Sequence, residues 1–161
     1  MNDLSVEVVR SKRRKKTAQA YMLDGRLRVL VPAGLEPDFE ADLIKDLVTK
    51  TRRRISSGDV DLNVRSRRLA KRYGLPVPVS IEWSNRQLRR WGSCTVSEGR
   101  IRISDRLATM PDWVLDWVIL HELAHLAVPD HGERFQALVS QYELGERAEG
   151  YLIAKSEALR D

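Results

Sequence analysis

The stretch HELAHLAVPDH, residues 121–131, contains all three histidines of a chain of 161 residues. His121 and His125 are four residues apart, so on a helix they share one face at a spacing that allows two imidazoles to bind one ion. Glu122 lies about 100° further round the helix and can approach a metal-bound water without being a ligand. Pro129 ends the helix, after which the chain can bring His131 to the first two histidines. The stretch predicts a metal centre with three nitrogen ligands and an open fourth position.

An open position is typical of a catalytic zinc site, whereas structural sites are usually closed by four protein ligands rich in cysteine. Cys94 is the only thiol in this chain. Three imidazoles suit Zn²⁺, which lowers the pKa of a bound water to about 7 and polarises a substrate carbonyl group. Glu122 would be the general base that takes the water proton and later delivers it to the leaving amine. We therefore predict a zinc metallopeptidase that hydrolyses peptide bonds.

The alternative for the same residues is a helix with two hydrogen-bonded core histidines, because His121 and His125 continue a stripe with Val114 and Val118. Two unliganded imidazoles and a glutamate on an apolar helix would each need a buried partner. A single metal site satisfies all three groups, so the sequence favours the metal site.

The composition predicts one domain over residues 1–161, with 42% hydrophobic and 32% charged residues. Neither a secretory signal nor an apolar run long enough for a transmembrane helix is found, and a single cysteine fits a reducing compartment. We therefore expect a cytoplasmic protein with no membrane partner. The net charge of +5 and the basic clusters at 10–16, 50–54 and 65–72 allow nucleic acid as a partner, although such clusters are more often solvated surfaces.

Apolar and polar residues alternate in two stretches of the first thirty residues. The apolar positions are Leu4, Val6 and Val8 in the first stretch and Leu27, Val29 and Val31 in the second. The intervening Asp24 and Gly25 are typical of a tight hairpin turn. We predict a three-stranded meander whose first connection carries the basic cluster at 10–16.

Two helices and a small antiparallel sheet are predicted to follow. The helices cover residues 37–56 and 61–73, and the strands cover residues 79–84, 89–96 and 100–104. The first helix has an apolar face formed by Phe39, Leu43, Leu47 and Val48. The resulting fold class is α+β.

The helix that carries the histidine motif is predicted over residues 113–128, where apolar residues lie on nearly every face, as in a buried central helix. Thr109 and Asp112 fit a capping box at its start. A second capping box at 130–133 predicts a further helix with His131 in its first turn.

Four blocks of the sequence, in their order and spacing, resemble the YgjP-like family of zinc metallopeptidases. They are RSKRRKKT (10–17), RRWGSC (89–94), ILHELAHL (119–126) and PDHGERF (129–135). The resemblance implies a minimal zincin-like α+β fold, related to the SprT-like and WLM-like proteases. It also implies that His121, His125 and His131 bind zinc and that Glu122 is catalytic. It implies no particular substrate.

Two other zincin patterns offer alternatives for the third ligand. The histidine spacing also fits the metzincin pattern, but that pattern has glycine where Val128 stands and a methionine turn further on, and no methionine follows Met110. A gluzincin would use a later glutamate, for which the candidates are Glu143, Glu146 and Glu149. His131 is preferred because its place after the helix break is the one found in the YgjP-like family.

In zincins generally, a peptide substrate pairs with an edge strand beside the metal-binding helix, which residues 89–94 or 100–104 would supply here. Gly92 would allow a close backbone approach, and Trp91 would either line the cleft or pack in the core. Cys94 has no spare histidine to activate it, so we interpret it as a small packed residue.

Two further roles have several candidates each, and the sequence does not choose among them. Stabilisation of the oxyanion could fall to Arg90, Arg106, Tyr142 or Tyr151. Orientation of a ligand imidazole could fall to Asp105, Asp130 or Glu133.

Two other functions compete with the simple peptidase. One is a nucleic-acid-associated protease of the SprT-like type, which the basic clusters would support. The other is a non-catalytic metal-binding module with a basic surface. The presence of Glu122, which no structural metal site requires, argues against the non-catalytic module.

Overall fold

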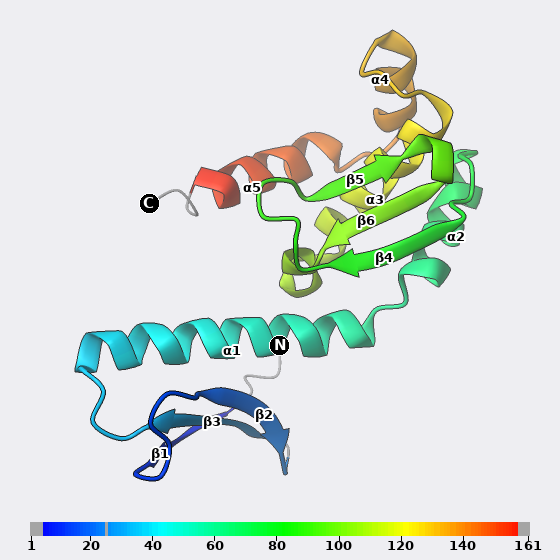
Figure 1. Cartoon of the computed structure of the whole chain (residues 1–161). Coiled ribbons are helices and arrows are strands. Elements are labelled where there is room, and N and C mark those ends of the chain that lie inside the picture. Colours follow the sequence, from blue (N-terminus) through cyan, green and yellow to red (C-terminus); the bar gives the residue numbers. More distant parts are fainter. Residues whose placement is uncertain (1–4, 25, 158–161) are drawn as a thin grey trace. The chain divides into compact units, whose positions relative to one another are not determined.

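The computed structural model describes residues 5–24 and 26–157, which divide between Ile55 and Ser56 into two compact units. The described residues contain five α-helices and two three-stranded sheets (Figure 1), so the α+β class is confirmed. The prediction of a single domain over 1–161 stays a prediction. No helix among the described residues is long and apolar enough to cross a membrane.

The N-terminal unit contains the strands β1 (Val6–Ser11), β2 (Gln19–Leu23) and β3 (Arg26–Pro32) in the spatial order β1-β3-β2. The antiparallel hairpin of β2 and β3 is confirmed, with Leu23 opposite Arg26, whereas Leu4 and Gly25 lie outside the described residues. The meander is wrong, because β1 pairs with β3 and runs parallel to it.

The central place of β3 has a physical reason. Leu27, Val29 and Val31 are completely buried, and a strand on each side of β3 helps to bury this apolar surface. The connection over residues 12–18 is long enough to cross the end of β3. Alternation in the sequence fixes which face of a strand is buried but not which strand lies beside it.

The helix α1 (Pro37–Asp59) covers the predicted range of 37–56 and continues for three more residues. Its apolar side chains pack against β3 and are contributed by Leu43, Ile44, Leu47 and Val48. Phe39 was predicted on the same face, but 59% of its surface is exposed. The middle turns of the helix therefore supply this small core.

The C-terminal unit begins with α2 (Leu62–Tyr73), which Asp61 caps through a hydrogen bond from the backbone N–H of Val64 and which ends at Gly74 with φ of 64°. Three strands follow it: β4 (Ser80–Ser84), β5 (Gly92–Thr95) and β6 (Arg100–Ser104). Their order is β4-β6-β5, and β4 runs parallel to β6, so the prediction of a purely antiparallel sheet is wrong. As in the first sheet, the strand with fully buried residues, Ile101 and Ile103, takes the centre.

Short 3-10 helices at Val96–Glu98 and Asp105–Thr109 flank β6, and three α-helices complete the unit: α3 (Asp112–Ala127), α4 (Glu133–Val139) and α5 (Gly145–Glu157). In Figure 1, α3 lies behind the sheet, and it packs against β5, β6, α2, α4 and α5. The C-terminal core is therefore built around α3.

Both predicted capping boxes are wrong. The hydroxyl group of Thr109 donates to the carbonyl of Arg106, 3.4 Å away, because residues 105–109 form a 3-10 turn, and α3 starts after Pro111 without a side-chain cap. Before α4, the carboxylate of Asp130 accepts a hydrogen bond from the backbone of Gly132 at 2.8 Å. His131 thus precedes α4 and does not lie in its first turn.

Candidate metal centre

His121 and His125 are carried by α3, whose side chains are buried along most of its length. Ile119, Leu120 and Leu123 are fully buried around them, so the backbone that bears the two imidazoles is held from several sides. The helix ends at Ala127, where the Val128 N–H still donates to the carbonyl of Ala124 at 2.8 Å. After the break, the chain turns back over the C-terminal end of α3.

This turn brings His131 to the two helical histidines. One ligand nitrogen from each of the three rings lies within 4.8 Å of those of the others. The Nε2 atoms of His121 and His131 are 3.3 Å apart, and the ring centres of His125 and His131 are separated by 4.6 Å. The three predicted ligands therefore converge on one point.

Phe135, one turn further on in α4, forms a common floor for the three rings. Its ring stacks on His125 with a centroid distance of 4.5 Å and meets His121 and His131 edge to face at 4.9 and 4.8 Å. Phe135 is 1% exposed. Sequence reasoning did not identify this role, because His131 lies before α4 and the contact depends on how the turn folds back onto α3.

The surroundings of His121 and His125 favour neutral imidazoles. Burial, with smaller contributions from the other two histidines, lowers the pKa of His121 to about 4. Burial also lowers the pKa of His125, again with a contribution from His131. The Nδ1 atom of His125 lies 3.3 Å from the carbonyl oxygen of Val128, so a proton on Nδ1 leaves the Nε2 lone pair available for a metal ion.

Glu122 is 6% exposed and lies on the side of α3 that faces β5. Its carboxyl group occupies the space that a side chain at Gly92 would fill, since an ideal Cβ at Gly92 would be 2.6 Å from Oε1 of Glu122. Burial raises the pKa of Glu122 to about 7, while the positive charge of Arg90 acts in the opposite direction. Gly92 was predicted to admit a close backbone approach, and the group that it admits is this carboxyl group.

A cleft of about 610 Å³ opens beside the histidines, with His121 and Glu122 in its wall. The opposite sides come from Arg90 and Trp91, which precede β5, and from Leu152 and Ile153 of α5. Trp91 has both of the roles that the sequence allowed, because it lines the cleft and also packs against the core.

The candidates for oxyanion stabilisation differ in whether they line the cleft. Arg90 lines the cleft. Arg106 is buried and donates from one terminal nitrogen to the carbonyls of Gln87 and Arg90, each at 2.9 Å, with its guanidinium group 4.0 Å from the centre of the Trp91 ring. It therefore supports the wall of the cleft from within.

The two tyrosines face other groups. Tyr142 donates its hydroxyl proton to the carbonyl of Trp113 at 2.9 Å, and burial raises its pKa to about 12. Tyr151 packs edge to face on Trp113 at 5.6 Å. Neither residue lines the cleft.

The remaining candidates can also be placed. Among the described residues, the cluster of metal-ligating groups consists of the three histidines, and of the alternative glutamates only Glu149 lines the cleft. The contact that orients His125 comes from the backbone of Val128, and the carboxylate of Asp130 is bonded to Gly132. Burial, with a contribution from Glu122, raises the pKa of Cys94 to about 11, which fits a packed thiol and not a nucleophile.

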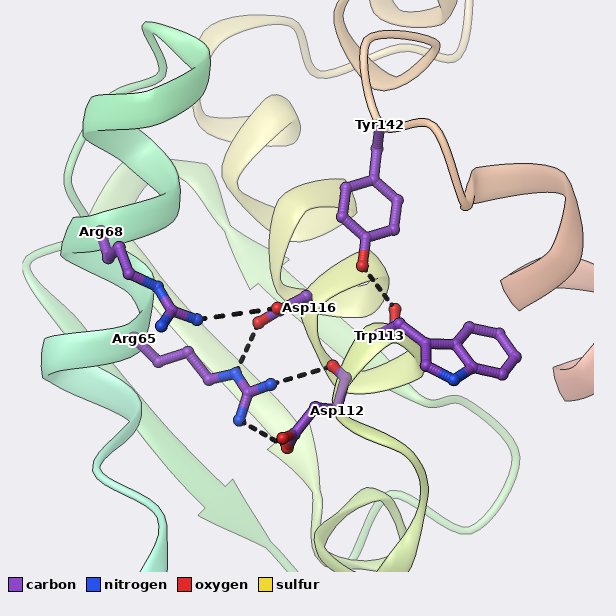
Figure 2. A network of polar contacts seen from close by, with 6 residues as sticks. All are labelled: Arg65, Arg68, Asp112, Trp113, Asp116 and Tyr142. Carbon is purple, nitrogen blue, oxygen red and sulfur yellow. Dashed lines mark hydrogen bonds and ion pairs between the residues drawn. The ribbon is translucent and has the colours of Figure 1, made fainter.

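An ion-pair network fixes the N-terminal part of α3 to α2 (Figure 2). Arg65 is 13% exposed, and it bonds to the carboxylate of Asp116 through Nε and to both the carboxylate and the carbonyl of Asp112 through its terminal nitrogens. Arg68 approaches the second oxygen of Asp116 at 3.7 Å. The network anchors the helix about one and a half turns before His121.

Comparison with solved structures finds one fold likeness that agrees with this arrangement. The crystal structure of the metallopeptidase zymogen of Methanocaldococcus jannaschii jannalysin matches with a TM-score of 0.52 and 19% sequence identity, covering 60% of this chain and 97% of that one. At this identity the likeness concerns the fold. No curated protein gives a significant match.

The family comparison is more specific. The model of the YgjP-like metallopeptidase domain matches residues 32–143, which include β5, α3 and all three histidines but not the block at 10–17. Since the match covers more than half of the sequence, the resemblance predicted from the motifs is confirmed, and the chain belongs to the YgjP-like family of metallopeptidases.

Proposed function

We propose that this metallopeptidase is zinc-dependent, that His121, His125 and His131 hold the zinc ion, and that Glu122 is the general base of peptide hydrolysis. The observation that carries the proposal is the convergence of three ring nitrogens within 4.8 Å of one another, together with a buried glutamate, Glu122, that lines the same cleft as His121.

The residues fit zinc in number, type and spacing. Zn²⁺ binds imidazole nitrogens at about 2.0–2.1 Å in tetrahedral geometry, which places two such nitrogens about 3.3 Å apart. His121 and His131 have their Nε2 atoms at that separation. Three histidines without a fourth protein ligand among the described residues leave room for water, as in catalytic sites.

Glu122 has the properties of a general base at neutral pH. When bound, zinc would lower the pKa of a water ligand and polarise the substrate carbonyl group. A carboxyl group with a pKa of about 7 can accept the water proton and then deliver it to the leaving amine. At neutral pH such a group gains and loses a proton at little cost in free energy. Arg90 lines the same cleft and offers positive charge to the oxyanion.

The sheet offers one strand edge beside this cleft. Because β6 is paired on both sides, residues 100–104 cannot accept a peptide, whereas β5 is paired only with β6 among the described strands. Gly92 at the start of β5 lines the cleft. A substrate that pairs with the free edge of β5 would therefore pass close to Glu122.

The test compares two glutamates of the same cleft, Glu122 and the exposed Glu149, each replaced by glutamine. Zinc-loaded wild type and variants are incubated with a mixture of denatured proteins, and new chain termini are counted by mass spectrometry. Wild type and Glu149→Gln should produce new termini, while Glu122→Gln should retain zinc and lose at least about a hundredfold in rate. Full cleavage by Glu122→Gln would reject Glu122 as the base.

Nucleic-acid binding and a cytoplasmic location stay predictions. Part of the charge in the basic clusters is used within the protein, because Arg10 pairs with Glu40 at 2.6 Å and Arg65 with Asp112 and Asp116. The proposal therefore names peptides alone as substrates.

A further inference from the structure

A second cleft, of about 750 Å³, lies next to the cleft that contains His121. Its charged lining consists of Glu82, Arg86, Arg89, Arg90 and Arg102. Arg90 lines both clefts, and the neighbouring residues Gly92 and Ser93 of β5 line the catalytic cleft and this one respectively. The second cleft, called here the arginine cleft, therefore adjoins the proposed path of the peptide.

The arginine cleft has more positive charge than its own acidic group neutralises. Glu82 is paired with Arg102 at 3.0 Å. Among the residues that the structure describes, the exposed guanidinium groups of Arg86 and Arg89 have neither an ion-pair nor a hydrogen-bond partner. Guanidinium groups present parallel N–H donors that match a carboxylate in two-point contact.

The loop that carries these arginines is held in place by hydrogen bonds to its backbone carbonyl groups. The carbonyl of Gln87 accepts hydrogen bonds from Ser104 and from the buried Arg106, and Arg106 also holds the carbonyl of Arg90. The side-chain amide of Gln87 donates to the hydroxyl group of Ser93 on β5 at 2.6 Å. Because the backbone of this loop is held in place, less conformational entropy is lost when a ligand binds it.

We propose that the arginine cleft is a subsite that binds an acidic side chain of the peptide substrate, close to the scissile bond. The inference rests on the proposed function, since it takes the peptide to lie along β5. Side chains of an extended peptide alternate between two faces, so a residue beside Ser93 can point into the arginine cleft while its neighbour faces the catalytic cleft. The acidic Glu82 in the lining favours a single carboxylate over the repeated negative charges of a nucleic-acid strand.

The experiment uses two pools of fluorescein-labelled decapeptides with blocked ends. One position is Glu in the first pool and Gln in the second, and the other positions are random uncharged residues. Wild type is assayed for cleavage of each pool, and zinc-loaded Glu122→Gln is assayed for binding by fluorescence anisotropy. The test variant is Arg86→Gln with Arg89→Gln, and the control is Arg67→Gln with Lys71→Gln, which removes the same charge from exposed positions on α2.

Wild type should cleave the Glu pool about tenfold faster than the Gln pool, and Glu122→Gln should bind it about tenfold more tightly. The Arg86/Arg89 variant should reduce both ratios to near one and leave hydrolysis of the Gln pool unchanged, whereas the control should keep both ratios. Ratios near one in wild type, or unchanged ratios in the Arg86/Arg89 variant, would overturn the proposal.

Two other results separate the subsite from its alternatives. If wild type cleaves neither pool but Glu122→Gln still prefers the Glu pool through Arg86 and Arg89, the proposed function fails and the subsite stands. A labelled twelve-nucleotide single strand is tested alongside the peptides. If the Arg86/Arg89 variant loses binding of this strand while the wild-type peptide ratios are near one, the arginine cleft binds nucleic acid and the proposal is wrong.

Discussion

The carboxyl group of Glu122 lies where the side chain of any residue other than glycine at position 92 would begin. An ideal Cβ on Gly92 would be 2.6 Å from Oε1, 2.9 Å from Cγ and 3.0 Å from Cδ of Glu122. The start of β5 and the proposed general base on α3 therefore fit together only because position 92 has no side chain. This contact couples the sheet to the proposed catalytic group.

Gly92→Ala should displace the Glu122 carboxyl group while leaving the histidines in place. We expect retained zinc and a loss in kcat of roughly a hundredfold, since misplacement of a catalytic group by about 1 Å has an effect of this size. Zinc content and cleavage rate are measured together. Gly150→Ala is the control, because nothing lies within 4 Å of its added Cβ on α5. Wild-type kcat in Gly92→Ala would contradict the coupling.

Phe135→Leu should weaken metal binding without unfolding the protein. The phenyl ring contacts all three imidazoles, and loss of such supporting contacts typically lowers metal affinity by about 10- to 100-fold. Competition with a chromophoric chelator measures the zinc affinity, and circular dichroism checks the fold. Phe39→Leu, at an exposed position on α1, should leave the affinity unchanged. Equal affinities in the two variants would show that Phe135 only fills space.

The metal-free protein should reveal the raised pKa of Glu122. Its folded value of about 7 lies above the ordinary value of 4.5, so protonation stabilises the fold below pH 4.5, and this contribution is lost as the pH rises to 7. His121, with its pKa lowered to about 4, acts in the opposite sense, because its contribution is lost as the pH falls below 6.5.

Comparison with Glu122→Gln separates the two effects, since the variant keeps His121. Between pH 4.5 and 7, metal-free wild type should lose up to about 3 kcal/mol of unfolding free energy relative to Glu122→Gln. Urea unfolding at a series of pH values provides the measurement. A difference between the two proteins that stays constant with pH would contradict the raised pKa.

Arg65→Ala should destabilise the C-terminal unit through Asp116. The Asp116 side chain is 17% exposed, and the variant would leave its charge largely uncompensated, at a cost of about 2–4 kcal/mol. Arg68→Ala removes a mostly exposed guanidinium group from the same carboxylate and should cost less than about 1 kcal/mol. Urea unfolding of both variants is the measurement. Equal losses would mean that burial of Arg65 adds nothing to the network in Figure 2.

The helix α3 and the turn after it were predictable because their signals are local. The spacing of His121 and His125 and the break at Pro129 specify a helix followed by a turn, and the family match supports their common purpose. Partners that are distant in the sequence were not predictable in the same way. The contact of Glu122 with Gly92 depends on how α3 packs against β5, and the parallel pairing of β1 with β3 depends on which strand is most buried.

Residue type also misled where burial decides the role. Arg106 was a candidate for oxyanion stabilisation, because arginine at a cleft can supply charge. The structure buries it, and its donors are used on backbone carbonyls. Tyr142 is occupied in the same way by the carbonyl of Trp113. A sequence states which donors a chain has, but only packing determines which of them face the substrate.

Metal content is the most direct test of the three-histidine centre. Wild type, Glu122→Gln and His131→Ala are purified identically, equilibrated with limiting zinc, and analysed for bound metal by elemental analysis. We expect one zinc ion per chain in wild type and in Glu122→Gln and clearly less in His131→Ala, because in the proposed site His131 is a ligand and Glu122 is not. Wild type without bound zinc, or full zinc retention by His131→Ala, would contradict the account.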